Sequence, residues 1–253
     1  MNQKIKKAAV LGAGVMGSAI AAHLANVGIP SFLLDIVPPE MIEAEKKKGL
    51  TFQSPEVRNR FAVFGKKRVQ ETRPASLYLK DDAENITVGT FEDHLSWVSQ
   101  ADWIIEAVIE DLNLKRELFK KLFPFLKEGT VVSSNTSGIS IQKMCEGFSR
   151  DFEERFLGTH FFNPPRYMKL LEIIPAKSTS KAVVEKMALV GEKILGKGVV
   201  YAKDTPNFIG NRIGAFATAI TMRTAIEDSY LIEEVDQITG PAMGRPKLAT
   251  FKL

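Results

Sequence analysis

Cysteine and long hydrophobic runs are scarce in this sequence, and each scarcity excludes a class of protein. The 253 residues include one cysteine, Cys145, so an internal disulfide cannot form. No apolar run approaches the roughly 20 residues that a membrane-spanning helix needs. The first letters, MNQKIKKAAVLGAG, pass directly into a strand pattern and leave no room for a secretory signal. We therefore expect a protein of the reducing cytoplasm without a membrane span.

The sequence also lacks a large excess of either charge. Lys and Arg total 34 and Asp and Glu total 30, which gives a net charge of +4. This small positive excess favours an anionic ligand and is weak evidence for nucleic acid. We therefore expect no nucleic-acid partner, and we assign no residues to a metal.

Strand-like and helix-like patterns alternate through the first half of the chain. KAAVLGAG is typical of a short buried strand, and VMGSAIAAHLANVG has helical spacing that ends at Gly28. Further strand patterns are PSFLLD, NITVGT, ADWIIEAV and TVVSSNT, with helix-like stretches between most of them. This alternation predicts a Rossmann-like α/β fold, in which a mostly parallel, doubly wound sheet carries helices on both faces.

The second half has a different pattern. FLGTHFFN, KLLEIIPA and GVVYAKD are strand-like, and a helix is predicted near 180–195. A long helix should follow, with Thr205 as its N-cap and Pro206 in its first turn. We therefore predict a Rossmann-like domain at 1–203 and the beginning of a mostly helical domain at 204–253. The latter is too short to bury its apolar stripe, so we expect it to be truncated and to contribute to a homo-oligomer.

A glycine-rich turn indicates the ligand of the first domain. VLGAGVMGSAI places Gly12, Gly14 and Gly17 in the spacing G-x-G-x-x-G, between a predicted strand and a predicted helix. The glycines permit a tight turn, close approach of backbone to a pyrophosphate, and packing of the helix on the strand. The helix N-terminus adds free N–H groups, so Val15 and Met16 join the predicted cofactor site. The alternative is that the glycines merely fit a tight turn.

Asp35 ends the second predicted strand and indicates which dinucleotide binds. Its carboxylate can accept hydrogen bonds from an adenosine ribose, with Ile36 next to it in the same site. The same charge would repel a 2′-phosphate at 4 Å by very roughly 4 kcal/mol at an effective dielectric of 20. The predicted cofactor of the 1–203 domain is therefore NAD rather than NADP.

A histidine and a glutamate stand in consecutive strand-like segments of FLGTHFFNPPRYMKLLEIIPA. Asn163 and the two prolines after it can reverse the chain between them, which would bring Glu172 alongside His160. Histidine is a suitable base for the hydroxyl proton released when an alcohol gives hydride to NAD. A neighbouring carboxylate would stabilise the imidazolium that forms. By itself, a buried histidine is more often a satisfied core residue.

The chain resembles the 3-hydroxyacyl-CoA dehydrogenase family over nearly its whole length. The segments that carry the resemblance are LGAGVMGSAIA, DWIIEAVIEDLNLKRELF, SSNTSGISI, GTHFFNPPRYMKLLEII, KDTPNFIGNR and GPAMGRPKLATF. Their amino-acid sequences are most similar to the dehydrogenase part of bacterial bifunctional fatty-acid β-oxidation enzymes. Those enzymes carry an enoyl-CoA hydratase domain elsewhere in the chain. The resemblance implies NAD-dependent oxidation of L-3-hydroxyacyl-CoA to 3-ketoacyl-CoA.

The resemblance also implies roles for individual residues. His160 matches the family's catalytic base and Glu172 the acid paired with it. Ser137 and Asn211 match residues that hold the substrate oxygen, although a helix N-cap and an ordinary helix residue are their alternatives. Where the family has a smaller, uncharged pair after HFFNP, this chain has Pro165 and Arg166.

The remaining matches concern the cofactor and coenzyme A. Glu110 and Lys115 match positions near the nicotinamide ribose, with a helix-start acid and a solvated lysine as alternatives. The rest of the predicted set consists of Asn135, Asn163 and Ser137 for the cofactor and Lys66, Lys67 and Arg68 for the phosphates of coenzyme A. For the basic stretches that hold those lysines, a solvated helix face is the alternative.

Two other functions stay open at this stage. One is a dehydrogenase of a short free 3-hydroxy acid on the same fold, which turnover of a CoA thioester against its free acid would separate. The other is a non-catalytic NAD-binding subunit, and the presence of His160, Glu172 and Ser137 argues against it.

Overall fold

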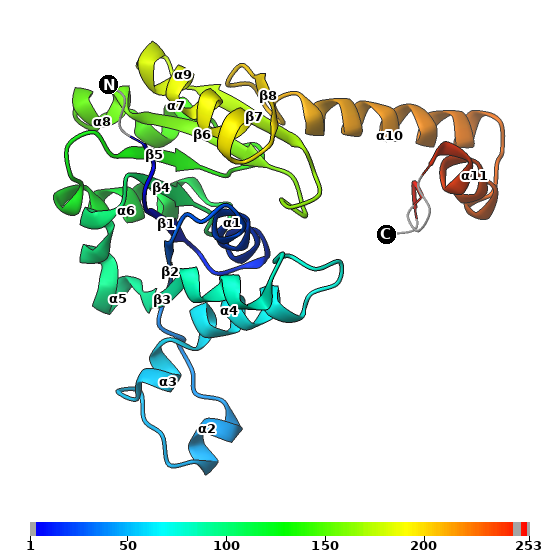
Figure 1. Ribbon diagram of the computed structural model, residues 1–253. Coiled ribbons are helices and arrows are strands. Elements are labelled where there is room, and N and C mark those ends of the chain that lie inside the picture. The colour runs from blue at the N-terminus through cyan, green and yellow to red at the C-terminus, as the bar shows by residue number, and fades with distance from the viewer. Residues whose placement is uncertain (1–3, 245–248, 252–253) are drawn as a thin grey trace. The chain divides into compact units, whose positions relative to one another are not determined.

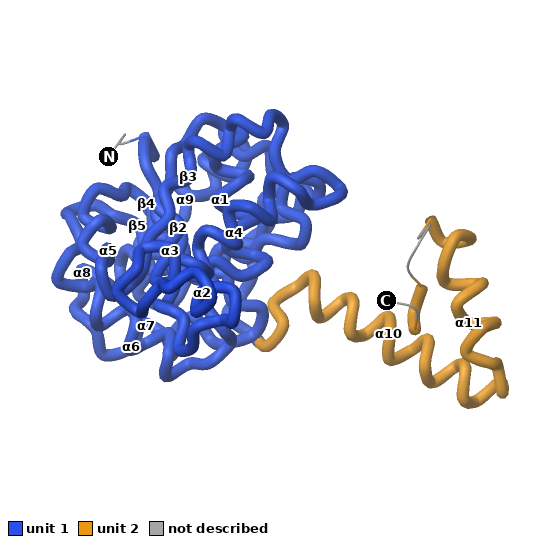
Figure 2. Tube along the Cα trace, turned by 90° about the horizontal axis from the view of Figure 1, so that it is seen from below, with its two compact units in different colours: residues 1–205 blue, residues 206–253 orange. Residues whose placement is uncertain are grey.

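The computed structural model describes residues 4–244 and 249–251. The chain forms two compact units, residues 1–205 and 206–253 (Figure 2). Of the family-like segment GPAMGRPKLATF, residues 245–248 lie outside the described part of the chain.

The first unit is built around one eight-stranded sheet (Figure 1). Its strand order is β3-β2-β1-β4-β5-β6-β7-β8, and the pairs from β3 to β6 are all parallel. β7 runs antiparallel to β6 and parallel to β8. The strands are β1 Ala8–Leu11, β2 Ser31–Asp35, β3 Ile86–Thr90, β4 Trp103–Glu106, β5 Val131–Ser134, β6 Phe156–Phe161, β7 Leu170–Pro175 and β8 Gly198–Tyr201. The predicted mostly parallel sheet is confirmed.

Helices cover both faces of this sheet, which makes it doubly wound. The α-helices of the unit are α1 Val15–Asn26, α2 Glu43–Lys47, α3 Pro55–Arg58, α4 Arg60–Glu71, α5 Phe91–His94, α6 Leu112–Leu122, α7 Ile141–Cys145, α8 Arg150–Glu154 and α9 Lys181–Leu189. On one face, Val10 of β1 belongs to the same buried cluster as Ile20 of α1 and Met187 of α9. On the other face, Phe119 of α6 packs against Phe156 of β6, with ring centroids 5.1 Å apart. Because successive side chains of a strand point to opposite faces, the fully buried strands pack against helices on both sides of the sheet.

The long helix of the second unit begins later than its sequence predicts. α10 spans Gly210–Glu227, so the predicted start with Thr205 as N-cap and Pro206 in the first turn is wrong. Asn207 and Phe208 have φ of 62° and 44°, and this left-handed backbone interrupts any helix that begins at Pro206. α11, Ile232–Thr239, follows. No helix in the described ranges is long and apolar enough to cross a membrane.

Candidate active site

The turn between β1 and α1 has the geometry that a dinucleotide requires. Gly12 has φ +106°, and a Cβ on it would lie 2.6 Å from the Ala107 carbonyl oxygen. A Cβ on Gly17 would lie 1.8 Å from the Gly12 carbonyl oxygen. A Cβ on Gly14 would meet no heavy atom of the described chain within 4 Å. The turn is therefore closed at two glycines and open at the third, where a pyrophosphate can approach the N-terminus of α1.

Asp35 connects this turn to the end of β2. Its Oδ2 accepts a hydrogen bond from the Ala13 N–H at 2.6 Å, and its Oδ1 accepts one from the Ile36 N–H at 2.7 Å. Burial raises the pKa of Asp35, the charge of Glu92 adds to the rise, and the two N–H bonds oppose it. The backbone thus fixes the orientation of the carboxylate at the edge where the ribose is predicted to bind.

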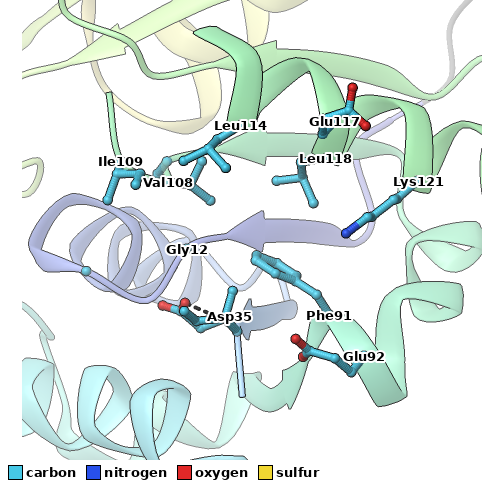
Figure 3. A pocket seen from close by; sticks show the side chains of 13 residues that line it. Gly12, Asp35, Phe91, Glu92, Val108, Ile109, Leu114, Glu117, Leu118 and Lys121 are labelled. Atoms are coloured by element: carbon cyan, nitrogen blue, oxygen red, sulfur yellow. Dashed lines mark hydrogen bonds between the residues drawn. The ribbon is translucent and has the colours of Figure 1, made fainter. Parts of the chain in front are cut away.

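A cavity of about 500 Å³ lies beside the turn, within the first unit (Figure 3). Val108, Leu114 and Leu118 form an apolar wall, and Asp35 and Glu92 lie on the side opposite to it (Figure 3). An apolar wall suits a flat aromatic base, and carboxylates suit ribose hydroxyls. The cavity therefore fits the adenosine half of NAD.

The sequence patterns did not identify Glu92, the second acidic residue on this side of the cavity. It lies two residues after β3, in α5, and accepts a hydrogen bond from the Val37 N–H at 3.1 Å. Its position just beyond the carboxyl end of a parallel strand was the available signal, because ligands bind at that edge.

Glu110 and Ser137 meet at the carboxyl ends of β4 and β5. Glu110 Oε1 accepts a hydrogen bond from the Ser137 N–H at 2.9 Å, and a second one from the Thr136 hydroxyl. Ser137 itself is exposed. The alternative that it caps the following helix is wrong, because the N-cap of α7 is Ser140, whose side chain accepts from the Lys143 N–H.

Lys115 is buried. The alternative that it is an ordinary solvated lysine is therefore wrong. Its side chain is 1% exposed, although it lies on the helix α6. Its ammonium is 2.6 Å from Glu106 Oε1 and 3.2 Å from Glu110 Oε2. The sequence patterns did not identify Glu106, because it is a single acidic residue at the end of the otherwise apolar buried strand β4.

His160 and Glu172 form a buried pair across β6 and β7. The antiparallel register places the two residues opposite each other, and His160 Nδ1 lies 2.7 Å from Glu172 Oε2. His160 is 4% exposed and Glu172 is 0% exposed. The loop between the strands reverses the chain as its asparagine and prolines predicted. The contact that the sequence suggested is present, and it orients the imidazole through Nδ1.

Hydrogen bonds hold the loop after β6 at its start and at Arg166. Asn135 accepts a hydrogen bond from the Phe161 N–H at 2.9 Å through its side-chain oxygen, so it ties the end of β5 to β6. Arg166 donates to the carbonyl oxygens of Ala75 and Leu77 at 2.7 and 2.6 Å. The arginine that departs from the family pattern thus fastens the loop to the chain after α4, while the predicted cofactor residue Asn163 is exposed on it.

Two of the residues predicted to meet coenzyme A, Lys66 and Lys67, lie on α4. In α4, Lys66 donates to the Ile86 carbonyl oxygen at 2.8 Å, whereas Lys67 is exposed, 3.8 Å from Glu71. Asn211 lies in the first turn of α10, in the second unit.

Comparison with known proteins decides the family. Residues 7–205 match the family described as 3-hydroxyacyl-CoA dehydrogenase, NAD binding domain. The chain belongs to the 3-hydroxyacyl-CoA dehydrogenase family. The predicted family and the predicted cofactor, NAD, are thereby confirmed.

Relatives in this family extend the match over the second unit. A probable 3-hydroxyacyl-CoA dehydrogenase of Bacillus subtilis is 54% identical over 252 residues, which cover 100% of this chain and 32% of the relative. A putative fatty acid oxidation complex trifunctional enzyme of Rickettsia felis is 35% identical and covers 100% of this chain and 33% of its own length. The chain therefore spans about a third of each of these two relatives.

The solved structures agree with this assignment. The (S)-3-hydroxybutyryl-CoA dehydrogenase of Ralstonia eutropha superposes with a TM-score of 0.71 at 28% identity. The superposition covers 96% of this chain and 79% of that one. The fold is thus that of the family.

Proposed function

We propose that this chain carries out the NAD-dependent oxidation of an L-3-hydroxyacyl-CoA to a 3-ketoacyl-CoA, as a step of fatty-acid β-oxidation. The observation that carries the proposal is the buried pair of His160 and Glu172, 2.7 Å apart, in a domain of the NAD-binding family. A module that only binds NAD has no need of a base held by a carboxylate. The length of its relatives supports a place in a longer protein with further domains, such as an enoyl-CoA hydratase.

The proposed chemistry divides between the cofactor and the side chains. When bound, NAD supplies the hydride acceptor. Glu172 holds His160 through Nδ1, so Nε2 is the proposed atom that takes the hydroxyl proton of the substrate. The carboxylate then stabilises the imidazolium, which is the role that a buried acid plays beside a catalytic histidine.

Ser137 and Asn211 are the proposed ligands of the substrate oxygen. Ser137 is exposed beyond the end of β5, and His160 lies in the neighbouring strand β6. Hydrogen-bond donors at the oxygen would stabilise the charge that develops as the proton leaves. Asn211 belongs to the second unit, which is also the proposed site of contact between copies of the chain.

The test is the formation of NADH, measured by absorbance, from an (S)-3-hydroxyacyl-CoA and from the corresponding free 3-hydroxy acid. We expect turnover of the thioester and at least roughly 100-fold lower kcat/KM for the free acid, because remote binding energy contributes to the rate. Equal or better turnover of the free acid would instead establish a free-acid dehydrogenase. NAD binding without turnover of either substrate would identify a binding subunit.

A further inference from the structure

A row of buried and half-buried charges lies beneath the turn that presents Ser137. Glu106 is the last residue of β4 and 0% exposed, Lys115 is 1% exposed, and Glu110 is 46% exposed at the outer end of the row. Resting on the proposed function, we propose that Glu106 and Lys115 are positioning residues. They hold Glu110 against the 136–138 turn, and Glu110 in turn places Ser137 for the substrate oxygen.

Lys115 is committed to acceptors of the protein itself. An ammonium has three N–H donors. Its nitrogen lies 2.6 Å from Glu106 Oε1, 3.2 Å from Glu110 Oε2 and 3.3 Å from the Val108 carbonyl oxygen. Lys115 thus connects Glu106 and the Val108 carbonyl to Glu110, so the position of its ammonium determines where the Glu110 carboxylate lies.

Glu106 fixes the inner end of the row. Its Oε1 accepts from the Val108 N–H at 2.7 Å as well as from Lys115, and its Oε2 accepts from the Ser134 hydroxyl. That hydroxyl accepts in turn from the Thr136 N–H at 3.2 Å. Burial raises the pKa of Glu106, and the charge of Lys115 opposes the rise. The charge of Lys115 thus stabilises the buried carboxylate of Glu106, and Glu106 in turn fixes the position of the Lys115 ammonium.

Glu110 transmits this position to the turn. Its Oε2 faces Lys115, and its Oε1 accepts from the Ser137 N–H at 2.9 Å and from the Gly138 N–H at 3.3 Å. Burial would raise the pKa of Glu110, but the hydrogen bond from Thr136 and the charge of Lys115 bring it below its usual value. A half-exposed glutamate has several rotamers, and the buried cation selects the one that reaches the turn.

Stability alone does not explain such a pair. Replacing a buried ion pair by apolar residues of similar volume is often neutral or stabilising, whereas removing one partner is costly. Variants can therefore separate a positioning role from a packing role. The informative comparison is between the double variant Glu106→Leu/Lys115→Met and each of its single variants.

The experiment measures thermal stability, turnover and amide exchange on the full chain. Each single variant should lower the Tm, and the double variant should regain most of the loss. In the double variant, kcat for an (S)-3-hydroxyacyl-CoA should nevertheless fall roughly 10- to 100-fold with a smaller change in KM, because misplacement of about 1 Å can cost on the order of 10² in rate. Exchange of the amides at 136–138, followed by mass spectrometry, should become faster.

A matched control is the exposed pair Lys181 and Glu185 on α9, whose charged atoms lie 3.6 Å apart. Lys181→Met/Glu185→Leu should leave Tm, kcat and the 136–138 exchange unchanged. Should Glu106→Leu/Lys115→Met fail to fold, Glu106→Gln/Lys115→Met, which keeps partners for Ser134 and Val108, is judged by the same criteria.

Two outcomes overturn the inference. One is a double variant with restored Tm and wild-type kcat, and the other is unchanged exchange at 136–138. Failure of the proposed function has a different signature, because the wild-type chain would then oxidise no hydroxyacyl-CoA. The exchange measurement still decides the positioning role in that case.

Discussion

Glu172 lies directly opposite His160 in the antiparallel pair of β6 and β7, and its Oε2 is 2.7 Å from the ring Nδ1. The two residues are 12 positions apart in the chain and come together through strand register. Because side chains alternate between the faces of a sheet, a slip of one residue would send Glu172 to the opposite face. The pairing therefore depends on the loop that sets the register as much as on the two residues.

His160→Gln should lower kcat for an (S)-3-hydroxyacyl-CoA by roughly 10²–10⁴, the usual contribution of a general base. NAD affinity, measured by quenching of protein fluorescence, should change little, because the cofactor cavity is lined by the turn after β1, the end of β2, the residues after β4, and helices α5 and α6. An unchanged kcat in a variant with wild-type Tm would remove His160 from the proposed mechanism.

Glu172→Gln should lower kcat as well, by less than the loss of the histidine. The amide can still accept a hydrogen bond from the ring, but it cannot neutralise the imidazolium. In the double variant with His160→Gln the two effects should not add, since the carboxylate acts only through the ring. Additive losses in kcat would show that Glu172 acts on the reaction independently of His160.

Asp35→Ser should weaken NAD binding and improve the relative binding of NADP. Glu92 remains in the same cavity, so the single variant should shift the preference only partly. Adding Glu92→Gln should shift the ratio of the two dissociation constants by roughly a further tenfold, about 1.4 kcal/mol of removed repulsion. Glu192→Gln, an exposed acid outside the cavity, is the control. Equal ratios in the single and double variants would exclude Glu92 from cofactor selection.

Lys67→Ala should raise KM for a CoA thioester about 3- to 10-fold and leave kcat nearly unchanged, if α4 meets the coenzyme A phosphates. Lys67 is exposed and its nearest acid, Glu71, is 3.8 Å away, so its charge is accessible to a ligand. Glu71→Gln serves as the control and should not raise KM. A thioester KM that is the same in the wild type and Lys67→Ala would leave α4 as a solvated helix.

His23 should make stability dependent on pH between about 4 and 6.5. Burial, with the charge of Lys197, lowers the pKa of His23 to about 4, against the hydrogen bond to the Leu195 carbonyl oxygen. As pH falls below 6.5, His23 becomes protonated in the unfolded state, whereas in the folded state it stays neutral until about pH 4. Stability is therefore lost from pH 6.5 down to about 4, by about 3 kcal/mol at most.

Urea unfolding at several pH values tests this expectation. In His23→Gln, the free energy of unfolding should be flatter between pH 6.5 and 4 than in the wild type. An identical pH slope in the two proteins would mean that His23 does not contribute to acid sensitivity.

The sequence by itself determined the elements, their order and the cofactor. Gly12, Gly14 and Gly17 stand in a local turn whose chemistry is encoded in consecutive residues, and Asp35 ends the next strand. Period-two and period-3.6 patterns are equally local, so the strands and most helices could be predicted. The start of α10 could not, because the left-handed backbone before it includes Phe208, and a phenylalanine gives no indication of that conformation.

Only the tertiary structure decided how distant charges combine. Lys115 on an amphipathic helix resembles any solvated lysine, and Glu106 is one acid in an apolar strand. Their burial and their contact arise because α6 packs on the carboxyl end of β4. Glu92 likewise reaches the cofactor cavity because β3 lies beside β2 in the sheet. Contacts of this kind depend on packing between segments that are not adjacent in the chain, so no local pattern of residues predicts them.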